Sequence, residues 1–242
     1  MPTGDWLRRL AADRDRLDRG STAQRVADVL RDHITEGTFP PGTRLNEETL
    51  RSALGVSRNT LREAFRLLAH DGLLTHELNR GVFVRTLSVA DIRDLYLMRR
   101  MLEGAAIRVP VALDQVLPQA GSAVVAAEEA AARGHWSDVA AADVAFHQAL
   151  ADLAGSPRVS EATRRLLAES QLAFQMVSDQ MVSDRRRLHE PCVAANRDLH
   201  RLLSAGRIAE AATVLEETLT GAERRLLAAY PSSLTKSSAQ AH

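Results

Sequence analysis

Apolar side chains in the first third of the chain recur at the spacing of helices. After Ser21, four of them fall three or four positions apart, as on one face of an α-helix: Val26, Val29, Leu30 and Ile34. This helix is expected to end before Gly37 and the break at residues 40–42, Pro-Pro-Gly. A brief second helix is expected from Glu47 to Leu54, where Gly55 stops it.

A third helix is expected after a turn of only Gly55 and Val56. Ser57 stands where an N-cap hydroxyl can accept a hydrogen bond from a free backbone N–H, and the helix runs from Arg58 to about His70. Its apolar stripe consists of Leu61, Ala64, Phe65 and Leu68, and its polar side carries Arg58, Asn59, Arg62 and Arg66. Two helices joined by so short a turn, the second with a basic outer face, predict a helix-turn-helix. Residues 73–78 and 82–85, joined through residues 79–81, then predict a hairpin, the wing.

The remainder of the chain, from Ser88 to about Tyr230, has helical periodicity throughout. We place about six helices there, starting near Ser88, Asp114, Ser137, Pro157, Pro191 and Arg207. Breaks are expected at Pro110, at Gly134, at residues 155–157, at the charged run 184–190 and at Gly206.

The predicted fold class is therefore mostly α. An N-terminal winged helix-turn-helix over residues 21–86 is followed by an all-α antiparallel helical bundle over residues 87–230. Residues 1–20 form a charged extension to which we assign no role. The tail over residues 231–242 is rich in Ser and is expected to be disordered.

Charge and cysteine content limit the class of protein. The 31 basic residues balance the 31 acidic ones, so any contact with nucleic acid must be local. Cys192 is the single cysteine, which excludes an internal disulfide and a Cys-rich zinc module. We expect its thiol to be buried and inert, with a reactive thiol as the alternative. No stretch has the length of a membrane span and the N-terminus lacks the apolar core of a signal peptide, so we expect a cytoplasmic protein with no membrane partner.

Several motifs, in a fixed order, resemble the GntR family of bacterial regulators. They are RDHITEGTFPPGTRLNEETL at residues 31–50, LGVSRNTLREAFRLLAHDGLL at 54–74 and RGVFV at 80–84. Further on, SVADIRDLYLMRRMLEG at 88–104 resembles the first effector-domain helix of the FadR subfamily, which carries an FCD effector-binding domain. The segment DVAFH at 143–147 resembles the Asp-x-x-x-His metal half-site of that domain. The resemblance extends over about residues 21–228.

The resemblance implies a homodimer bound to double-stranded operator DNA, with recognition helices in successive major grooves and wings at the neighbouring minor grooves. Guanidinium groups at the start of the third helix can reach guanine edges or phosphates, and a Gly at the wing tip permits close approach. The expected DNA-binding residues are Ser57, Arg58, Asn59, Thr60, Arg62, Arg80 and Gly81. One departure is Glu48, where the family often has an Arg that contacts the DNA backbone. Arg51 could replace it.

In related effector domains an Asp and three His hold a divalent metal of the Zn or Ni type, and a bound carboxylate completes the coordination. Here Asp143 and His147, four residues apart on one helix, supply half of that set. The other two His positions of the family fall on Asn196 and Thr218, and His200 could supply a third ligand only if its helix is rotated. A divalent metal and a metal-free polar cavity therefore stand as alternatives.

Arg99 is the candidate anchor for an anionic effector, because an Arg fork can hold a carboxylate through two hydrogen bonds. An ion pair with Glu103, four residues on, is the equal alternative. The effector-binding set expected from the sequence is Arg99, Asp143, His147, Asn196 and Thr218. The ligand is an organic acid, a larger acyl conjugate, or absent.

The sequence favours a transcriptional regulator, expected to be a repressor, whose operator binding responds to a small-molecule effector. A DNA-binding protein with a degenerate bundle that serves only for dimerisation is the second interpretation. A metal-dependent enzyme built on Asp143 and His147 is the third. We expect no enzyme, because the chain offers no nucleophile with a base and an orienting group, no Gly-rich phosphate loop and too few metal ligands.

Overall fold

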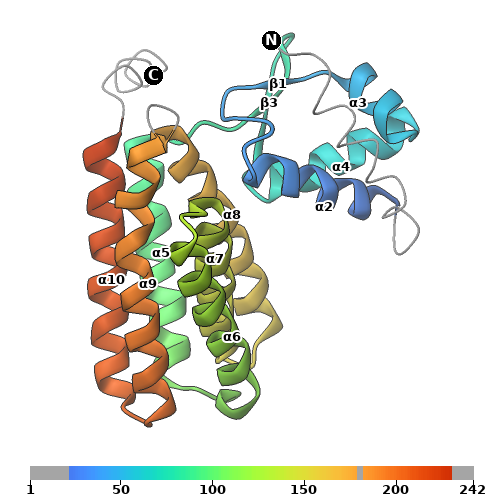
Figure 1. The fold of residues 1–242 in the computed structure, drawn as a ribbon. Helices are drawn as coiled ribbons and strands as arrows, with labels where there is room; N and C mark the ends of the chain where they lie inside the picture. Colours follow the sequence, from blue (N-terminus) through green and yellow to red (C-terminus); the bar gives the residue numbers. More distant parts are fainter. Residues whose placement is uncertain (1–21, 179–181, 231–242) are drawn as a thin grey trace. The chain divides into compact units, whose positions relative to one another are not determined.

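The computed structural model describes residues 22–178 and 182–230, and the chain divides into two compact units between Thr86 and Leu87. The expectations for residues 1–20 and 231–242 lie outside the described residues. In the described part, the N-terminal unit contains three helices and a small sheet, and the second unit is built from helices (Figure 1). This arrangement confirms the predicted mostly-α class, a winged helix-turn-helix followed by a helical bundle.

The N-terminal unit packs its helices around one apolar core. It contains α2 (Thr22–Thr35), α3 (Glu47–Leu54) and α4 (Arg58–His70), the last two with the bounds that the sequence predicted. The core side chains from these helices are Val26, Leu30, Ile34, Leu50, Leu54, Leu61, Phe65 and Leu68, each at most 2% exposed. Arg31 and Asp71 add a mostly buried ion pair between α2 and the end of α4, with 2.6 Å between Nη2 and Oδ2.

Local signals in the sequence set the turn between α3 and α4. Gly55 ends α3 at φ 68°, a left-handed conformation that favours glycine. Ser57 then caps α4, because its side-chain oxygen accepts a hydrogen bond from the Thr60 backbone N–H at 3.1 Å. The turn is therefore short enough to hold the start of α4 close to α3.

The wing is part of a three-stranded antiparallel sheet with the order β1-β3-β2 in the described residues. Strands β2 (Leu74–Glu77) and β3 (Gly81–Val84) pair in the register Thr75 opposite Phe83, which confirms the predicted hairpin. The sequence did not predict β1 (Arg44–Leu45), which pairs Arg44 with Phe83 on the other side of β3. Two residues carry no periodicity, so only the long-range pairing shows this strand.

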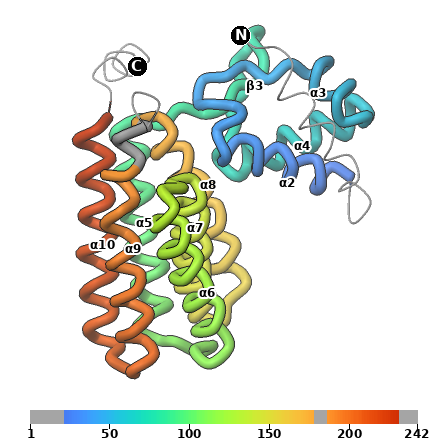
Figure 2. Tube along the Cα trace, viewed as in Figure 1, coloured from blue at the N-terminus to red at the C-terminus, as the bar shows by residue number. Residues whose placement is uncertain are grey.

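The second unit is a bundle of α5 (Val89–Arg108), α6 (Leu113–Ala132), α7 (Trp136–Asp152), α8 (Pro157–Ser178), α9 (Val182–Ser204) and α10 (Ile208–Ala229). The helices run alongside one another with short connections, and Figure 2 shows α9 and α10 side by side. Both α5 and α9 contact α7, so these three helices meet inside the bundle. No described helix is sufficiently long and apolar to cross a membrane.

The predicted start of a helix at Pro191, after a break at residues 184–190, is wrong. The helix α9 begins at Val182 and contains Pro191. Leu188 and Cys192, four residues apart, are both buried, so residues 186–192 belong to an amphipathic helix. Arg186 and Glu190 pair on its outer side at 2.8 Å. This packing offsets the hydrogen bond that proline removes from the helix.

We expect Phe65→Ala to lower the free energy of unfolding of the N-terminal unit by about 3–5 kcal/mol, because it leaves a cavity in a core where Phe65 is fully buried. Urea unfolding followed by far-ultraviolet circular dichroism measures this loss. The control is Leu78→Ala, at a side chain 89% exposed, which should change stability by less than about 0.5 kcal/mol. Equal effects of the two substitutions would contradict the described core.

Candidate nucleic-acid interface and bundle site

Two exposed arginines at the start of α4 share one carboxylate. Arg58 and Arg62 each place Nε 3.3 Å from Oε2 of Glu47, which lies in the first turn of α3. Their side chains remain 67% and 51% exposed. Glu47 therefore orients both guanidinium groups on the outer side of α4 while leaving most of their N–H donors open to an external acceptor.

The other predicted contact residues at this end of α4 lie beside the arginines. Ser57 and Thr60 bond each other through their hydroxyl oxygens at 2.8 Å, so both side chains also stabilise the helix start. Asn59 is exposed. Arg51, the possible substitute for the arginine that the family often has at position 48, pairs with Glu48 in its own helix, with 2.5 Å between Nη2 and Oε1.

The predicted wing-tip residues also lie at the surface. Arg80 pairs with Glu77 and lies over the Phe83 ring, with its guanidinium carbon 5.4 Å from the ring centre. Gly81 has φ 114°, a conformation in which a side chain would be strained.

Arg44, on β1, is a candidate that the sequence reasoning missed. A Cβ placed on Gly81 would lie 3.3 Å from Arg44 Nε, so the guanidinium lies against the wing turn. The arginines at positions 58, 62, 66 and 80 each have an acidic partner, whereas the exposed Arg44 has none in the described part of the chain. Its only sequence signal was a basic residue between Gly42 and the second helix, which is too common to single out.

A chain of polar side chains crosses the inside of the bundle from α5 through α7 to α9. Arg99 donates from Nε to Glu103 Oε1 at 2.8 Å, and His147 Nδ1 lies 2.5 Å from the other oxygen of Glu103. On the far side of the imidazole ring, Nε2 lies 3.7 Å from Asp143 Oδ1, which accepts a hydrogen bond from Asn196 Nδ2 at 2.7 Å. The structure thus brings together four of the five predicted effector residues and realises the Arg99 to Glu103 pair.

Because Arg99 and Glu103 are both buried, the pKa of each depends on the charge of the other. Burial by itself would raise the pKa of Glu103, but Arg99 and His147 outweigh it and hold this pKa below its usual range. Burial likewise opposes the charge of Arg99, and Glu103 outweighs it so that the pKa of Arg99 is raised. Burial raises the pKa of Tyr96, which therefore keeps its hydroxyl proton.

Beside these side chains, three buried polar atoms have no hydrogen-bond partner among the residues that the structure describes. They are Arg99 Nη2, Tyr96 Oη and Asn196 Oδ1. The Arg99 guanidinium lies over the Tyr96 ring at 5.4 Å, so two of these atoms belong to one stacked pair. A buried donor or acceptor left unpaired is costly, and these atoms together offer two donors and one acceptor to a polar molecule.

The donor set does not fit the divalent metal that the resemblance implies. Asp143 and His147 remain, but the amide group of Asn196 directs an N–H toward the carboxylate, where a cation would need an electron pair. The Thr218 hydroxyl donates to Val214 in its own helix, and His200 Nε2 lies 3.2 Å from the Leu117 carbonyl oxygen, on the α6 side. Among the described residues no three His, Cys, Asp or Glu side chains are grouped to hold a metal.

Cys192 lies close to the same cluster and is buried. Burial raises the pKa of its thiol to about 12, and Arg225 offsets this only in part, with Nη2 3.9 Å from Sγ. The thiol therefore stays protonated near neutral pH, which agrees with the expected inert cysteine.

We expect Glu103→Gln to lower the free energy of unfolding by about 3–5 kcal/mol at pH 7, because it leaves the Arg99 guanidinium buried without a counter-charge. The folded-state pKa of Glu103 is lowered, so its contribution is complete above the unfolded value of about 4.3 and is lost as the pH falls through the folded value. The difference between the two proteins should therefore shrink as the pH is lowered from about 5 toward 3.

Urea titrations at several pH values measure that difference. The control is Glu161→Gln on α8, where the carboxylate pairs with Arg164 and Arg165 at the surface. Its effect at pH 7 should stay below about 1 kcal/mol because solvent screens the pair. A Glu103→Gln protein as stable as the unsubstituted chain would show that the buried carboxylate is not needed.

Comparison with known proteins gives matches for both units. The model of the bacterial regulatory proteins of the gntR family matches residues 22–84, and that of the FCD domain matches residues 94–221. A "Probable D-xylose utilization operon transcriptional repressor" of Paenarthrobacter nicotinovorans is 30% identical over 182 residues, which cover 74% of this chain and 80% of that protein.

Two further matches differ in how much of each protein they cover. The HTH-type transcriptional regulator YdhC of Bacillus subtilis is 40% identical over 82 residues, so the matched part is only 37% of that protein. The crystal structure of a transcriptional regulator GntR from Rhodococcus sp. RHA1 is 40% identical, with a TM-score of 0.80, and covers 88% of this chain and 100% of that one. The chain therefore belongs to the GntR family of bacterial regulatory proteins and is a DNA-binding transcriptional regulator with a C-terminal FCD domain.

Proposed function

We propose that this regulator is a repressor of the FadR subfamily, whose N-terminal unit reads the operator and whose bundle binds the effector. The observation that carries the reading role is the pair Arg58 and Arg62, held on the exposed side of α4 by Glu47. In the major groove their open N–H groups can reach guanine edges or phosphates, with Ser57, Asn59 and Thr60 beside them. Arg80, Gly81 and Arg44 would then follow the neighbouring minor groove.

Two such heads, in a homodimer, match a pseudo-palindromic operator of two half-sites. The proposal places the protein in the cytoplasm with the DNA and assigns it no enzyme activity. The buried charges of the bundle support this, because Glu103 is occupied by Arg99 and His147 rather than facing a reacting group.

The effector that fits the bundle is a small organic acid which also carries a hydroxyl or amino group, bound without a metal. Its carboxylate would accept from Arg99 Nη2 and Tyr96 Oη, and its donor group would satisfy Asn196 Oδ1. Asp143 and His147 would line the same site through their contacts with Asn196 and Glu103. Binding to one arrangement of the dimer in preference to another would change operator affinity.

We expect Arg58→Ala and Arg62→Ala each to weaken operator binding by about 1–3 kcal/mol, because each removes a guanidinium group from the reading surface. Fluorescence anisotropy with operator and random DNA at fixed salt measures the loss. The control is Arg133→Ala, an exposed arginine of the bundle that pairs with Glu129. Two arginine variants that bind the operator as well as the control does would remove this assignment.

We expect small hydroxy acids to raise the melting temperature of the chelator-treated protein by a few degrees near 100 times their Kd. Tyr96→Phe should weaken this response about tenfold in ligand concentration, because it removes one donor. Tyr230→Phe is the control, since its hydroxyl bonds the Leu87 carbonyl outside the cluster. A response that appears only with added divalent metal would overturn the metal-free site, and no response to any acid would favour a bundle used for dimerisation alone.

A further inference from the structure

Helix α5 presents an apolar stripe on the outside of the bundle. Leu97, Met98 and Met101 are 49%, 38% and 60% exposed, which is unusual for large apolar side chains so close together. A spacing of four residues places Leu97, Met101 and the exposed Ala105 on one face of the helix. The α5 stripe, defined as Leu97, Met98, Met101 and Ala105, is therefore a surface that burial in a partner would stabilise.

The two ends of the α5 stripe carry opposite charges. Asp94 precedes it and Arg108 follows it on the same face, and both are exposed. Neither has an ion-pair partner among the described residues, although Arg100 of the same helix is paired with Glu223. Each charge lies seven positions from Met101, so the pattern is symmetric about that residue in position and opposite in sign.

We propose that the α5 stripe binds the α5 stripe of a second copy of this chain, with the two helices antiparallel and the twofold axis at Met101. In this register Asp94 of each copy faces Arg108 of the other, and Leu97 faces Ala105. The two Met101 side chains meet at the axis. A parallel pairing would instead place like charges opposite each other, so the charges select the antiparallel arrangement.

Gly104 leaves open space beside the α5 stripe. The missing side chain at Gly104 leaves room that the Arg108 guanidinium now fills, with Nη1 2.9 Å and Cζ 3.9 Å from where a Cβ would lie. This guanidinium is free to swing toward Asp94 of the other copy, because it is the end of a flexible side chain.

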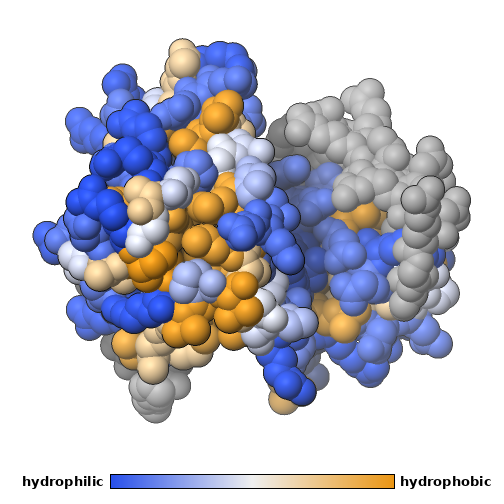
Figure 3. All heavy atoms as spheres, turned by 90° about the horizontal axis from the view of Figure 1, so that it is seen from below, coloured by the Kyte–Doolittle hydropathy of each residue, from blue (hydrophilic) through white to orange (hydrophobic). Residues whose placement is uncertain are grey.

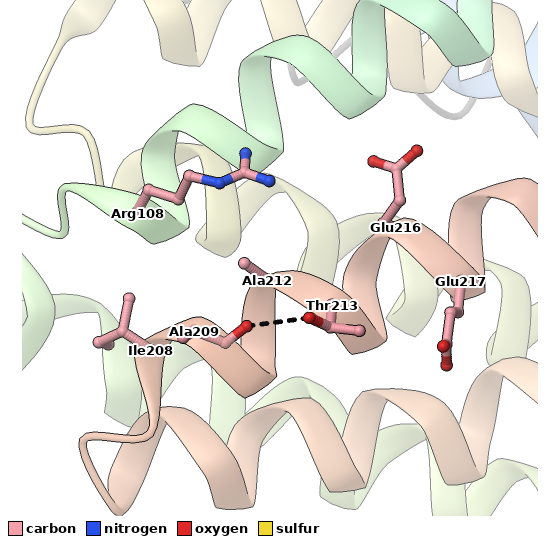
Figure 4. Close-up of a pocket in the computed structure, with 7 residues that line it drawn as sticks. All are labelled: Arg108, Ile208, Ala209, Ala212, Thr213, Glu216 and Glu217. Carbon is pink, nitrogen blue, oxygen red and sulfur yellow. Dashed lines mark hydrogen bonds between the residues drawn. The ribbon is translucent and has the colours of Figure 1, made fainter.

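A groove of about 710 Å³ lies beside this position, between the end of α5 and α10 (Figure 4). Arg108 reaches over it from α5, while Ile208, Ala209 and Ala212 form its apolar floor on α10. Apolar surface also continues beyond the helix to the exposed Val109 and Val111, and Figure 3 shows hydrophobic residues gathered on this end of the bundle within a hydrophilic rim. This apolar surface adjoins the α5 stripe, so a second copy bound there would also cover part of it.

This inference rests on the proposed function in one respect, the need for two reading heads, and it names the surface that joins them. The first test introduces Met101→Cys in the full chain and adds oxidised glutathione as the oxidant. Two cysteines at a twofold axis are close enough for a disulfide, so we expect most of the protein to run as a linked dimer without reductant. The unsubstituted chain should not link, since Cys192 is buried.

Leu97→Cys is the matched position control. In the proposed register its two copies are about 12 Å apart along the helix axes, too far for a disulfide, so little linked dimer is expected. Efficient linking at position 97 with none at position 101 would overturn the register.

The second test reverses the charges and measures the dimer Kd by sedimentation. Asp94→Arg and Arg108→Asp should each raise the dimer Kd at least about tenfold, and the two together should restore it to within about threefold. Val125→Asp, on the exposed part of α6, is the control and should leave the Kd unchanged. Dimers that tolerate both single reversals, or a double variant that stays dissociated, would overturn the inference.

Operator binding by the same variants separates the two proposals. Loss of the dimer together with weaker operator binding, restored in the double variant, supports both. A stable dimer through α5 that binds no operator would remove the proposed function alone, while operator-bound dimers insensitive to every α5 substitution would remove this interface alone.

Discussion

Glu103 is a carboxylate with no exposed surface, and the polar contacts that stabilise its charge determine how the side chains inside the bundle are arranged. Arg99 from its own helix forms an ion pair with Glu103, and His147 from α7 contacts its other oxygen, so these contacts join α5 to α7 at a fixed point. A buried charge is tolerated only when it is paired and hydrogen-bonded, which ties these three side chains to one geometry. Through Asp143 and Asn196 the same polar chain reaches α9.

The polar chain is also the basis of the ligand proposed for the bundle. The pattern in which a carboxylate orients a histidine is common behind metal ligands. Here the ring faces Asp143, whose oxygen already accepts from an amide, so the site has exchanged metal donors for hydrogen-bond donors. Polar atoms of Arg99, Tyr96 and Asn196 are buried without a hydrogen-bond partner among the described residues, and the proposed effector site rests on them. At the two positions where the resemblance implies histidine, the chain has Asn196 and Thr218. Polar groups therefore remain at these positions, but their chemistry differs from that of histidine.

In the N-terminal unit, the positive charge available to DNA is local and does not come from the composition of the whole chain. The chain has equal numbers of acidic and basic residues, so an attractive field for DNA cannot come from net charge. Glu47 holds two arginines at the start of α4, so the guanidinium groups proposed to read the operator are already oriented in the free protein. Arg44 has no such partner in the described part of the chain and adds a positive charge beside the wing.

The sequence by itself determined the elements whose signals are local. Gly55, Ser57 and the apolar spacing of α4 predicted the turn and the bounds of two helices, because caps and periodicity depend only on neighbouring residues. It also placed Asp143 and His147 on one inward face. Pro191 gave a wrong prediction for the same reason. The rule that proline breaks a helix considers only neighbouring residues and leaves out the packing of Leu188 and Cys192 in the core.

Only the tertiary structure decided which side chains meet across helices. The hydrogen bond between Asn196 and Asp143, the contact between Glu103 and His147, the direction of His200 toward α6 and the strand at Arg44 all join residues far apart in sequence. Helical spacing gives the face of a helix on which a residue lies, but the rotation of that helix against its neighbours is set by the packing of the whole core.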